Sequence, residues 1–185
     1  MNRTYVRWPL LYANTVRAEG AYTGAGCFAG GIHRELDASK RWLSMTACIF
    51  CEIVAGRAKA SIVYQDASII SFLDYAPITP GHLLVVPRAH VSSLSDLDDT
   101  TGAHAFVVAK QLARAVYRSS LVSDGIMVWL ADGEAAGQEV PHLHLHVLPR
   151  IHGDGVRLTF KRGRAPTRAQ LDALATDVRA SSELQ

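Results

Sequence analysis

The chain contains little cysteine, little net charge and no long apolar run. Three cysteines in 185 residues are too few for a disulfide framework. No stretch of about 18 consecutive apolar residues is present, so no membrane span is expected. The formal net charge is +2, which argues against a broad nucleic-acid surface, because such a surface needs a basic stripe to neutralise phosphates. We expect a cytoplasmic protein whose cysteines are reduced.

The first part of the chain differs in composition from the rest. Residues 1–45 mix Gly, Ala, Arg and aromatic residues without a period of 2 or 3.6. They contain no apolar core of a signal peptide, and their acidic residues do not suit a transit peptide. We interpret residues 1–45 as a disordered or loosely attached extension that carries no targeting signal.

From residue 48 the chain shows the patterns of regular elements. Short helices are expected over 48–55 and 169–178, and a long helix over about 100–119. Apolar runs bounded by turn residues predict strands over 61–64, 69–73, 82–87 and 125–130. Strands clustered as an antiparallel meander, with one long helix on the sheet and short flanking helices, are typical of the α+β class.

The long helix is expected to be amphipathic. Its predicted apolar face comprises Phe106, Ala109, Leu112, Ala113 and Val116. A second face carries basic side chains at i, i+4 spacing, namely Lys110, Arg114 and Arg118. We interpret this basic row as a solvated surface.

The most informative segment is 140–149, where histidines occupy every second position of an otherwise apolar run, at His142, His144 and His146. Alternate residues of a strand share a face, so a strand here would align the three imidazoles on one side of a sheet. Burying imidazoles without partners costs roughly a few kcal/mol each, so packing alone would favour valine or threonine. Because imidazole is a nucleophile, acid, base and metal ligand near neutral pH, we favour a functional site over a structural strand.

This segment matches the signature His-φ-His-φ-His-φ-φ, where φ is apolar, and the chain resembles the histidine triad (HIT) superfamily. Further blocks are similar and occur in the superfamily's order: Cys48-Ile49-Phe50-Cys51, Phe72-Leu73-Asp74, Thr79-Pro80-Gly81-His82, Val85-Val86-Pro87-Arg88-Ala89-His90 and Gly133-Glu134-Ala135-Ala136-Gly137-Gln138. The resemblance is greatest to the bacterial histidine triad nucleotide-binding proteins. It implies a HIT-like α+β fold and hydrolysis of purine nucleoside phosphoramidates.

The resemblance implies catalytic roles for His144, His146, His82 and Gln138. His144 would attack the α-phosphorus of a nucleotide and form a nucleotidyl-histidine, which water then hydrolyses. For Nε2 of that ring to attack, Nδ1 must carry the proton. His146 and His82 would bond phosphate oxygens, with His146 beside the bridging atom. Gln138 would stabilise the developing charge.

The resemblance also implies a purine nucleotide ligand. The carboxylate of Asp74 would accept hydrogen bonds from the two ribose hydroxyls, and apolar side chains would enclose the base. The implied nucleotide-binding residues are Ile49, Phe50, Ile53, Phe72, Leu73, Asp74, Gln138, His144 and His146. Taken without the resemblance, the apolar members of this set equally suit an ordinary core.

Cys48 and Cys51 form a C-x-x-C pair, which by itself fits a redox pair or two small apolar residues of a short helix. With His90 and His142 they make a Cys2His2 set, which suits tetrahedral zinc at a closed structural site. The resemblance supports zinc, because many bacterial relatives bind it at these positions. His142 would then be a zinc ligand and would help to position His144.

Two positions depart from the family pattern. Ala131 replaces a usual Asn, and Glu139 replaces a usual Ser or Thr. Both usual residues touch the phosphate region, so we expect weaker substrate binding or slower turnover. Three functions therefore stay open: phosphoramidate hydrolysis or transfer, cleavage of dinucleoside polyphosphates such as diadenosine tetraphosphate, and nucleotide-binding regulation with little turnover. A metal-only or redox role for the cysteines is a further alternative.

The extent of the resemblance predicts the domain organisation. Residues 46–152 would form the HIT domain, and 153–185 a C-terminal tail with a short helix. Residues 1–45 would be the extension, or the product of an over-long gene model, since Met45 directly precedes the family's usual start. Family members are typically homodimers with the long helix near the interface. We therefore expect a homodimer that binds a purine nucleotide and has no nucleic-acid or membrane partner.

Overall fold

The structure is a computed structural model that describes residues 48–157 and 165–182. The extension predicted over residues 1–45 lies outside the described residues. The chain divides into two compact units between Asp154 and Gly155. The first unit contains the sheet and all the predicted site residues, and the second contains the terminal helix.

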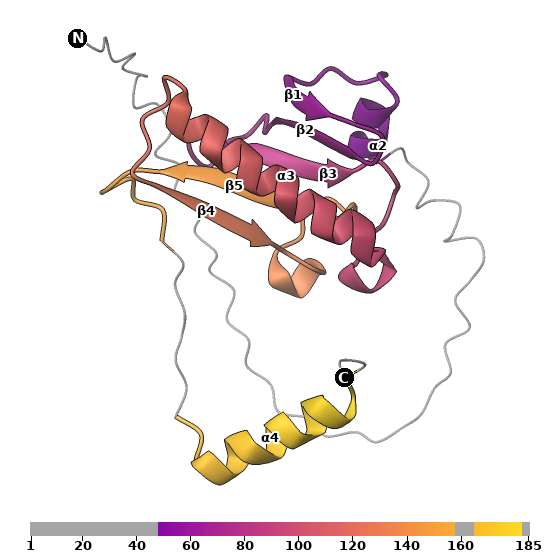
Figure 1. Cartoon of the computed structure of the whole chain (residues 1–185), viewed down its shortest axis with the longest axis vertical. Helices are drawn as coiled ribbons and strands as arrows, with labels where there is room; N and C mark the ends of the chain where they lie inside the picture. Colours follow the sequence, from indigo (N-terminus) through magenta and orange to yellow (C-terminus); the bar gives the residue numbers. More distant parts are fainter. Residues whose placement is uncertain (1–47, 158–164, 183–185) are drawn as a thin grey trace, which may run out of the picture. The chain divides into compact units, whose positions relative to one another are not determined.

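A five-stranded antiparallel sheet is the centre of the first unit (Figure 1). Its strands are β1 (Ile62–Gln65), β2 (Ile69–Leu73), β3 (Leu83–Pro87), β4 (Gly125–Leu130) and β5 (Leu145–Arg150). The strand order is β1-β2-β3-β5-β4, so the first three strands form a meander and β5 lies between β3 and β4. The predicted α+β class is confirmed.

Among the described residues, the first unit contains two α-helices and the second unit contains one. They are α2 (Ile49–Val54), α3 (Asp99–Arg118) and α4 (Arg168–Ala180), with short 3-10 turns η1 (Leu94–Asp96) and η2 (Glu134–Ala136). The Asp98 carboxylate caps α3 by accepting from the Thr101 amide at 2.9 Å. Thr167 and Gln170 form a capping box at the start of α4. None of the described helices is long and apolar enough to cross a membrane.

The side chains of the central strands alternate between two apolar clusters, one on each face of the sheet. On the face covered by α3, hereafter the α3 face, the buried cluster contains Ile69, Leu83, Val85, Leu145 and Val147 of the strands and Ala105, Val108, Ala109, Leu112 and Val116 of α3. On the opposite face, hereafter the α2 face, it contains Ile70, Phe72, Leu84 and Val86 with Phe50 and Ile53 of α2. Both faces are therefore covered.

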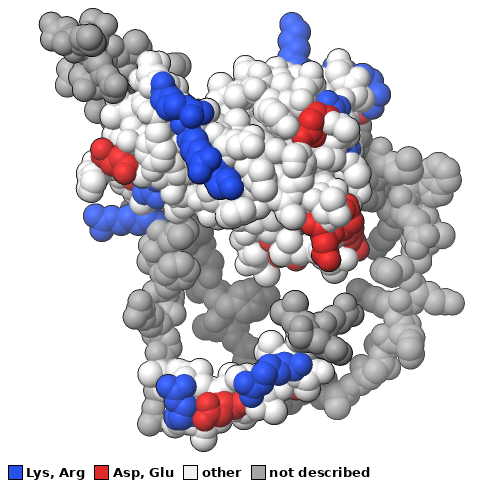
Figure 2. Space-filling view, viewed as in Figure 1, with Lys and Arg blue, Asp and Glu red and all other residues white. Residues whose placement is uncertain are grey.

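One residue of the predicted apolar face of α3 points away from the core. Phe106 is 60% exposed, whereas its neighbour Ala105 is fully buried. Successive helical residues are about 100° apart, so a stripe centred on Ala105 and Leu112 leaves Phe106 at its margin. The basic row is solvated as predicted. Figure 2 shows Lys and Arg side chains in a line along α3, and Lys110, Arg114 and Arg118 are all exposed.

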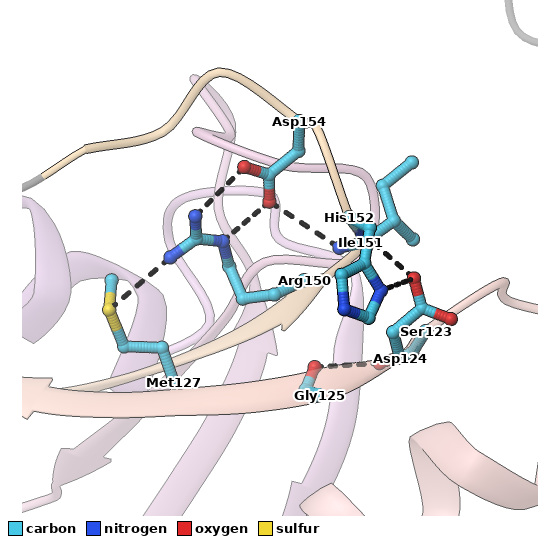
Figure 3. A network of polar contacts seen from close by, with 8 residues as sticks. All are labelled: Ser123, Asp124, Gly125, Met127, Arg150, Ile151, His152 and Asp154. Atoms are coloured by element: carbon cyan, nitrogen blue, oxygen red, sulfur yellow. Dashed lines mark hydrogen bonds and ion pairs between the residues drawn. The ribbon is translucent and has the colours of Figure 1, made fainter.

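A polar network holds the outer ends of β4 and β5 together (Figure 3). The Arg150 guanidinium donates from Nη2 to Asp154 Oδ1 at 2.8 Å. The Asp124 carboxylate, just before β4, accepts from the backbone amide of His152 at 2.8 Å and lies 2.9 Å from its ring Nδ1. These contacts fix the chain where the first unit ends.

Candidate active site and metal centre

The alternation of the histidines predicted a continuous strand, but only part of the segment is a strand. Strand β5 begins only at Leu145, so His146 lies in it while His142 and His144 precede it. The reason is the local backbone bonding. Pro141 has no amide proton for a strand ladder, the His142 amide donates to the Val140 carbonyl at 2.8 Å, and the Leu143 amide donates to the Val91 carbonyl at 2.7 Å. The turn before β5 consequently separates the surroundings of His142 from those of His146.

His142 lies with the two cysteines and His90, as the sequence predicted. The ligand atoms of Cys48, Cys51, His90 and His142 all lie within 4.8 Å of one another. Nδ1 of His142 is 3.5 Å from the Cys48 sulfur and 3.6 Å from that of Cys51. Nδ1 of His90 is 3.2 Å from the Cys51 sulfur. Two ligands of a tetrahedral zinc ion, one sulfur and one nitrogen, are about 3.5 Å apart, so this group fits a metal.

The surroundings of this group favour a metal over a redox pair. Nε2 of the buried His142 ring lies 2.8 Å from the Pro87 carbonyl. That bond requires a proton on Nε2 and leaves the Nδ1 lone pair facing the sulfurs, as in outer-shell bonds of metal-binding histidines. Burial raises the pKa of the Cys51 thiol, and a hydrogen bond with Cys48 acts in the same direction.

His144 has the protonation pattern of a nucleophile. Its Nδ1 lies 2.7 Å from the His142 carbonyl, which can only accept a hydrogen bond, so Nδ1 carries the proton. Nε2 therefore keeps its lone pair. The ring is 6% exposed and packs edge-on against Phe50, with 5.1 Å between ring centroids. Burial lowers the pKa of His144, so the ring is neutral near pH 7.

Three further groups form a row beside His144. Nδ1 of His82 lies 3.1 Å from Oδ2 of Asp74, and its Nε2 lies 2.9 Å from Nδ1 of His146. Burial lowers the pKa of His82, and the Asp74 charge opposes this. Burial, together with His144 and His82, lowers the pKa of His146 to about 3. The contact between Asp74 and His82 was not predicted, because no motif shows that the intervening loop folds back.

The predicted nucleoside-binding residues line one cleft of about 580 Å³ on the α2 face. They are Ile49, Phe50, Ile53, Phe72, Leu73 and Asp74. Lys59, Ala60, Ser61, Tyr75 and Leu84 complete the lining and were missed, since no local signal distinguishes them from ordinary loop and strand residues. Nucleotide binding by these residues stays a prediction.

Gln138 holds a neighbouring loop in shape. Its Oε1 accepts from the Gly133 amide at 2.7 Å, and its Nε2 donates to the Ser92 carbonyl at 3.0 Å. Gly133 has a φ of +84°, which favours glycine. Around this loop is a cleft of about 830 Å³ lined by Ser92, Ser93, Asp132, Gly133, Glu134, Gly137, Gln138, Glu139 and Pro141. Of the two unusual positions, Ala131 is buried and Glu139 is exposed at this cleft.

His104 and His152, for which the sequence suggested no partner, each lie beside a carboxylate. Nε2 of His104 on α3 lies 2.6 Å from the Asp66 carboxylate in the β1–β2 turn, and Asp66 also accepts from the Ile69 amide at 2.7 Å. This contact ties α3 to the turn. His152 pairs with Asp124 in the network of Figure 3. Both lie away from the histidine segment and serve the fold.

The fold and the site define a class of protein: an antiparallel α+β domain with a buried, correctly protonated histidine and a Cys2His2 group beside it. The sequence profile of the HIT domain matches residues 55–153, which is more than half of the chain. The chain belongs to the HIT domain family.

Known relatives agree with this assignment. An uncharacterized HIT-like protein of Borreliella burgdorferi is 42% identical over 120 residues, which cover 64% of this chain and 85% of that protein. A zinc-bound histidine triad family protein from Mycobacterium smegmatis is 38% identical with a TM-score of 0.58, covering 74% of this chain and 98% of that one. A histidine triad nucleotide-binding protein from Candida albicans is 25% identical with a TM-score of 0.65, covering 73% and 96%.

Proposed function

We propose that this protein hydrolyses purine nucleoside phosphoramidates through a nucleotidyl intermediate on His144. The observation that carries the proposal is the bond between Nδ1 of His144 and the His142 carbonyl at 2.7 Å, which leaves a neutral Nε2 as the attacking atom. The likeness to a histidine triad nucleotide-binding protein supports a nucleotide ligand.

The first step forms a bond from Nε2 of His144 to the α-phosphorus and breaks the bond from phosphorus to the amine nitrogen. The substrate phosphate adds its negative charge to that of Asp74, which already opposes the lowering of the His82 pKa by burial. For this step we propose that His82 carries a proton on each ring nitrogen when the substrate is bound, favoured by the negative charges of Asp74 and of the phosphate. As the amine leaves, His146 gives it the Nε2 proton and takes the Nε2 proton of His82 on Nδ1, across the 2.9 Å contact.

The second step reverses the proton transfer. Water attacks the phosphorus, its oxygen bonds to phosphorus, and the bond to His144 breaks. His146, now without a proton on Nε2, takes the proton of the water, and its Nδ1 proton returns to His82. The product is a nucleoside monophosphate whose new oxygen comes from water, and His144 regains its free Nε2.

The nucleoside would bind in the cleft lined by Phe50, Phe72 and their neighbours. Phe50 touches both the cleft and the His144 ring, which would place the α-phosphate beside Nε2 when the base is bound. Asp74 would accept from the ribose hydroxyls with the oxygen capacity that its contacts to His82 and the Ala76 amide leave free.

Zinc is the metal that we propose for the Cys2His2 group. Cys48, Cys51, His90 and His142 supply two sulfurs and two nitrogens, the donor set of a closed structural site. The zinc-bound mycobacterial relative supports the choice. The ion would tie α2 to the turn that precedes His144, and it would supply stability and orientation only.

We also propose a homodimer that pairs through β4. This edge strand consists of Gly, Ile, Met, Val, Trp and Leu, none of them buried, and Val128 is 39% exposed. An apolar edge strand of this kind invites pairing with a second copy. Light scattering should give twice the chain mass for the wild type. Val128→Lys should give the single-chain mass, and an unchanged mass would contradict this interface.

The function is tested by product analysis of wild type and His144→Ala. Both are given adenosine 5'-phosphoramidate and diadenosine tetraphosphate in parallel. We expect AMP from the phosphoramidate with wild type, and a loss of at least about a thousandfold in the variant, because the nucleophile is removed. Mass spectrometry of wild type quenched with denaturant at alkaline pH, which preserves the acid-labile P–N bond, should detect the nucleotidyl adduct on the peptide that contains His144.

Other outcomes would favour the alternatives. Preference for the tetraphosphate would make the protein a dinucleoside polyphosphate hydrolase. Nucleotide binding with no product that depends on His144 would favour a regulatory protein. A double variant, Glu139→Ser with Ala131→Asn, restores the usual family residues. If it does not raise turnover, the regulatory function gains further support.

A further inference from the structure

We propose that Lys59 selects purine bases that carry an oxygen at C6, such as guanine and hypoxanthine, over adenine, which carries an amino group there. This inference rests on the orientation of the nucleoside in the proposed function, and it deepens that function by naming the base. The favoured substrates would be phosphoramidates of guanosine and inosine.

The order of the strands places the base at the β1 end of the nucleoside cleft. The groups assigned to the phosphate belong to β3 and β5, since His82 lies directly before β3 and His146 lies within β5. Asp74, assigned to the ribose, follows β2, and its amide donates to the His82 carbonyl at 2.9 Å. In the order β1-β2-β3-β5-β4, β1 is the next strand beyond β2. Because the ribose separates the base from the phosphate, the base extends toward β1.

The segment that leads into β1 forms this end of the cleft. The Leu73 amide donates to the Ser61 carbonyl at 3.0 Å, which holds the segment beside the end of β2. Lys59 and Ser61 both line the cleft that Asp74 lines. A base bound at this end would therefore present its polar atoms to the side chains of Lys59 and Ser61.

The ammonium of Lys59 is available to a ligand. Arg57, two residues earlier, is held by Glu52 through contacts of 2.7 Å from Nε and 2.8 Å from Nη2. Lys59 is exposed, and among residues 48–157 and 165–182 it pairs with no carboxylate. Of the two cations in this segment, only Lys59 lines the cleft.

The hydrogen-bonding chemistry of an ammonium distinguishes the two kinds of purine. It has three donors and no acceptor. Guanine presents two acceptors side by side, O6 and N7, whereas adenine presents N7 beside an amino group that is itself a donor. The hydroxyls of Ser61 and Tyr75, which also line the cleft, can donate or accept and so suit either base. Because Lys59 is exposed, we expect about fivefold selection, the lower end for contacts of this kind.

The experiment first measures binding, which needs no turnover. Isothermal titration calorimetry of the full-length wild type gives the dissociation constants of GMP, IMP and AMP. We expect GMP and IMP to bind about fivefold more tightly than AMP. IMP is included because it has the C6 oxygen of guanine and lacks the 2-amino group. Values of kcat/KM for the 5'-phosphoramidates of guanosine, inosine and adenosine should follow the same order.

Variants of Lys59 test whether this side chain is the cause. Lys59→Met keeps the length of the side chain and removes its donors, so the ratio of the AMP to the GMP dissociation constant should fall from about five to about one. Lys59→Gln supplies an amide that can donate to adenine N7 and accept from its amino group, so this ratio should fall below one. Lys110→Met, at an exposed lysine on α3, should keep the wild-type ratio.

Failure of this inference can be told apart from failure of the proposed function. Equal binding of the three nucleotides by wild type, or a wild-type ratio in Lys59→Met, would overturn base selection and leave hydrolysis standing. An equal loss of affinity for all three nucleotides in Lys59→Met would also overturn it, because Lys59 would then contact the ribose or the phosphate. If the nucleotides bind in the expected order and no phosphoramidate is cleaved, hydrolysis fails and base selection stands.

Discussion

The two faces of the sheet are built from the same strands and have different composition. On the α3 face, five strand residues are buried and apolar, and the buried Ser71 lies among them; α3 covers this face. The five are Ile69, Leu83, Val85, Leu145 and Val147. On the α2 face, the apolar cluster gives way along β5 to His146, with His144 and His82 beside it. The α3 face therefore supplies hydrophobic stability, and the α2 face holds the histidines to which we assign the proposed chemistry.

The difference teaches how a small domain keeps several imidazoles buried. His82, His142 and His144 are all buried, and each ring forms a hydrogen bond to a carbonyl, a carboxylate or another ring. Such bonds offset much of the desolvation of a buried polar group. Apolar burial contributes folding energy on both faces, through the cluster under α3 and the cluster beside α2.

The largest expected effect is the loss of stability when the apolar cluster under α3 is disrupted. Leu112→Ala removes a side chain that is 7% exposed in the α3 cluster, and we expect it to lower the free energy of unfolding by about 2–5 kcal/mol through lost burial and a cavity. Phe106→Ala, on the same helix but 60% exposed, should change it by less than about 0.5 kcal/mol. Urea denaturation measures both.

Measuring the activity of Leu112→Ala tests whether the two faces have separate roles. Per folded molecule, Leu112→Ala should release AMP at the wild-type rate, because the α2 face keeps its groups. A large loss of activity in folded Leu112→Ala would contradict the division of roles between the faces, and so would equal destabilisation by the two substitutions.

The second expected effect concerns the metal group on the α2 face. His90 is exposed, so His90→Ala removes a ligand with little loss of packing. We expect loss of zinc by elemental analysis and a fall in unfolding free energy of about 2.7 kcal/mol when free zinc is one hundred times the wild-type dissociation constant. His152→Ala removes a more exposed histidine outside the group and should keep the zinc. Equal zinc content in the two variants would count against the site.

The smallest expected effect is the change in the free energy of unfolding between pH 6.5 and 5, where His146 accounts for at most about 2 kcal/mol. In the folded protein the pKa of His146 is lowered to about 3, and in the unfolded chain it is about 6.5. The unfolded state thus binds more protons between these values, so stability is full above pH 6.5 and falls as the pH decreases, by up to about 1.4 kcal/mol per pH unit for one such group.

Substitution identifies the His146 contribution. His146→Asn should make the decline between pH 6.5 and 5 less steep, whereas His152→Asn at an exposed position should leave the slope as it is. Denaturation midpoints at several pH values measure this. A slope that is the same in wild type and His146→Asn would show that the ring is solvated in the folded protein.

Local patterns were sufficient for the elements and for much of the site. Apolar runs bounded by turn residues at β2 and β3, and the capping residues before α3, predicted those elements to within one or two residues. The motifs at Cys48, His82 and His142 also named groups that come together. These predictions succeed because period, capping and turn chemistry act over a few neighbouring residues.

Longer-range features required the tertiary structure. The start of β5 at Leu145 depends on the Leu143 amide bonding to Val91, and the Asp74 contact with His82 depends on the closure of a loop. The side of α3 that carries Phe106 depends on how the helix lies on the sheet.

The sequence by itself determined the α+β class, most of the strands and helices, and the candidate reactive and metal-binding side chains. The tertiary structure alone decided which nitrogen of His144 is free, which groups Asp74 and Gln138 contact, and which acidic side chains share a cleft with Gln138. The physical reason is that propensity and periodicity are local, whereas proton positions and charge clusters arise from atoms that only the folded chain brings within a few ångströms.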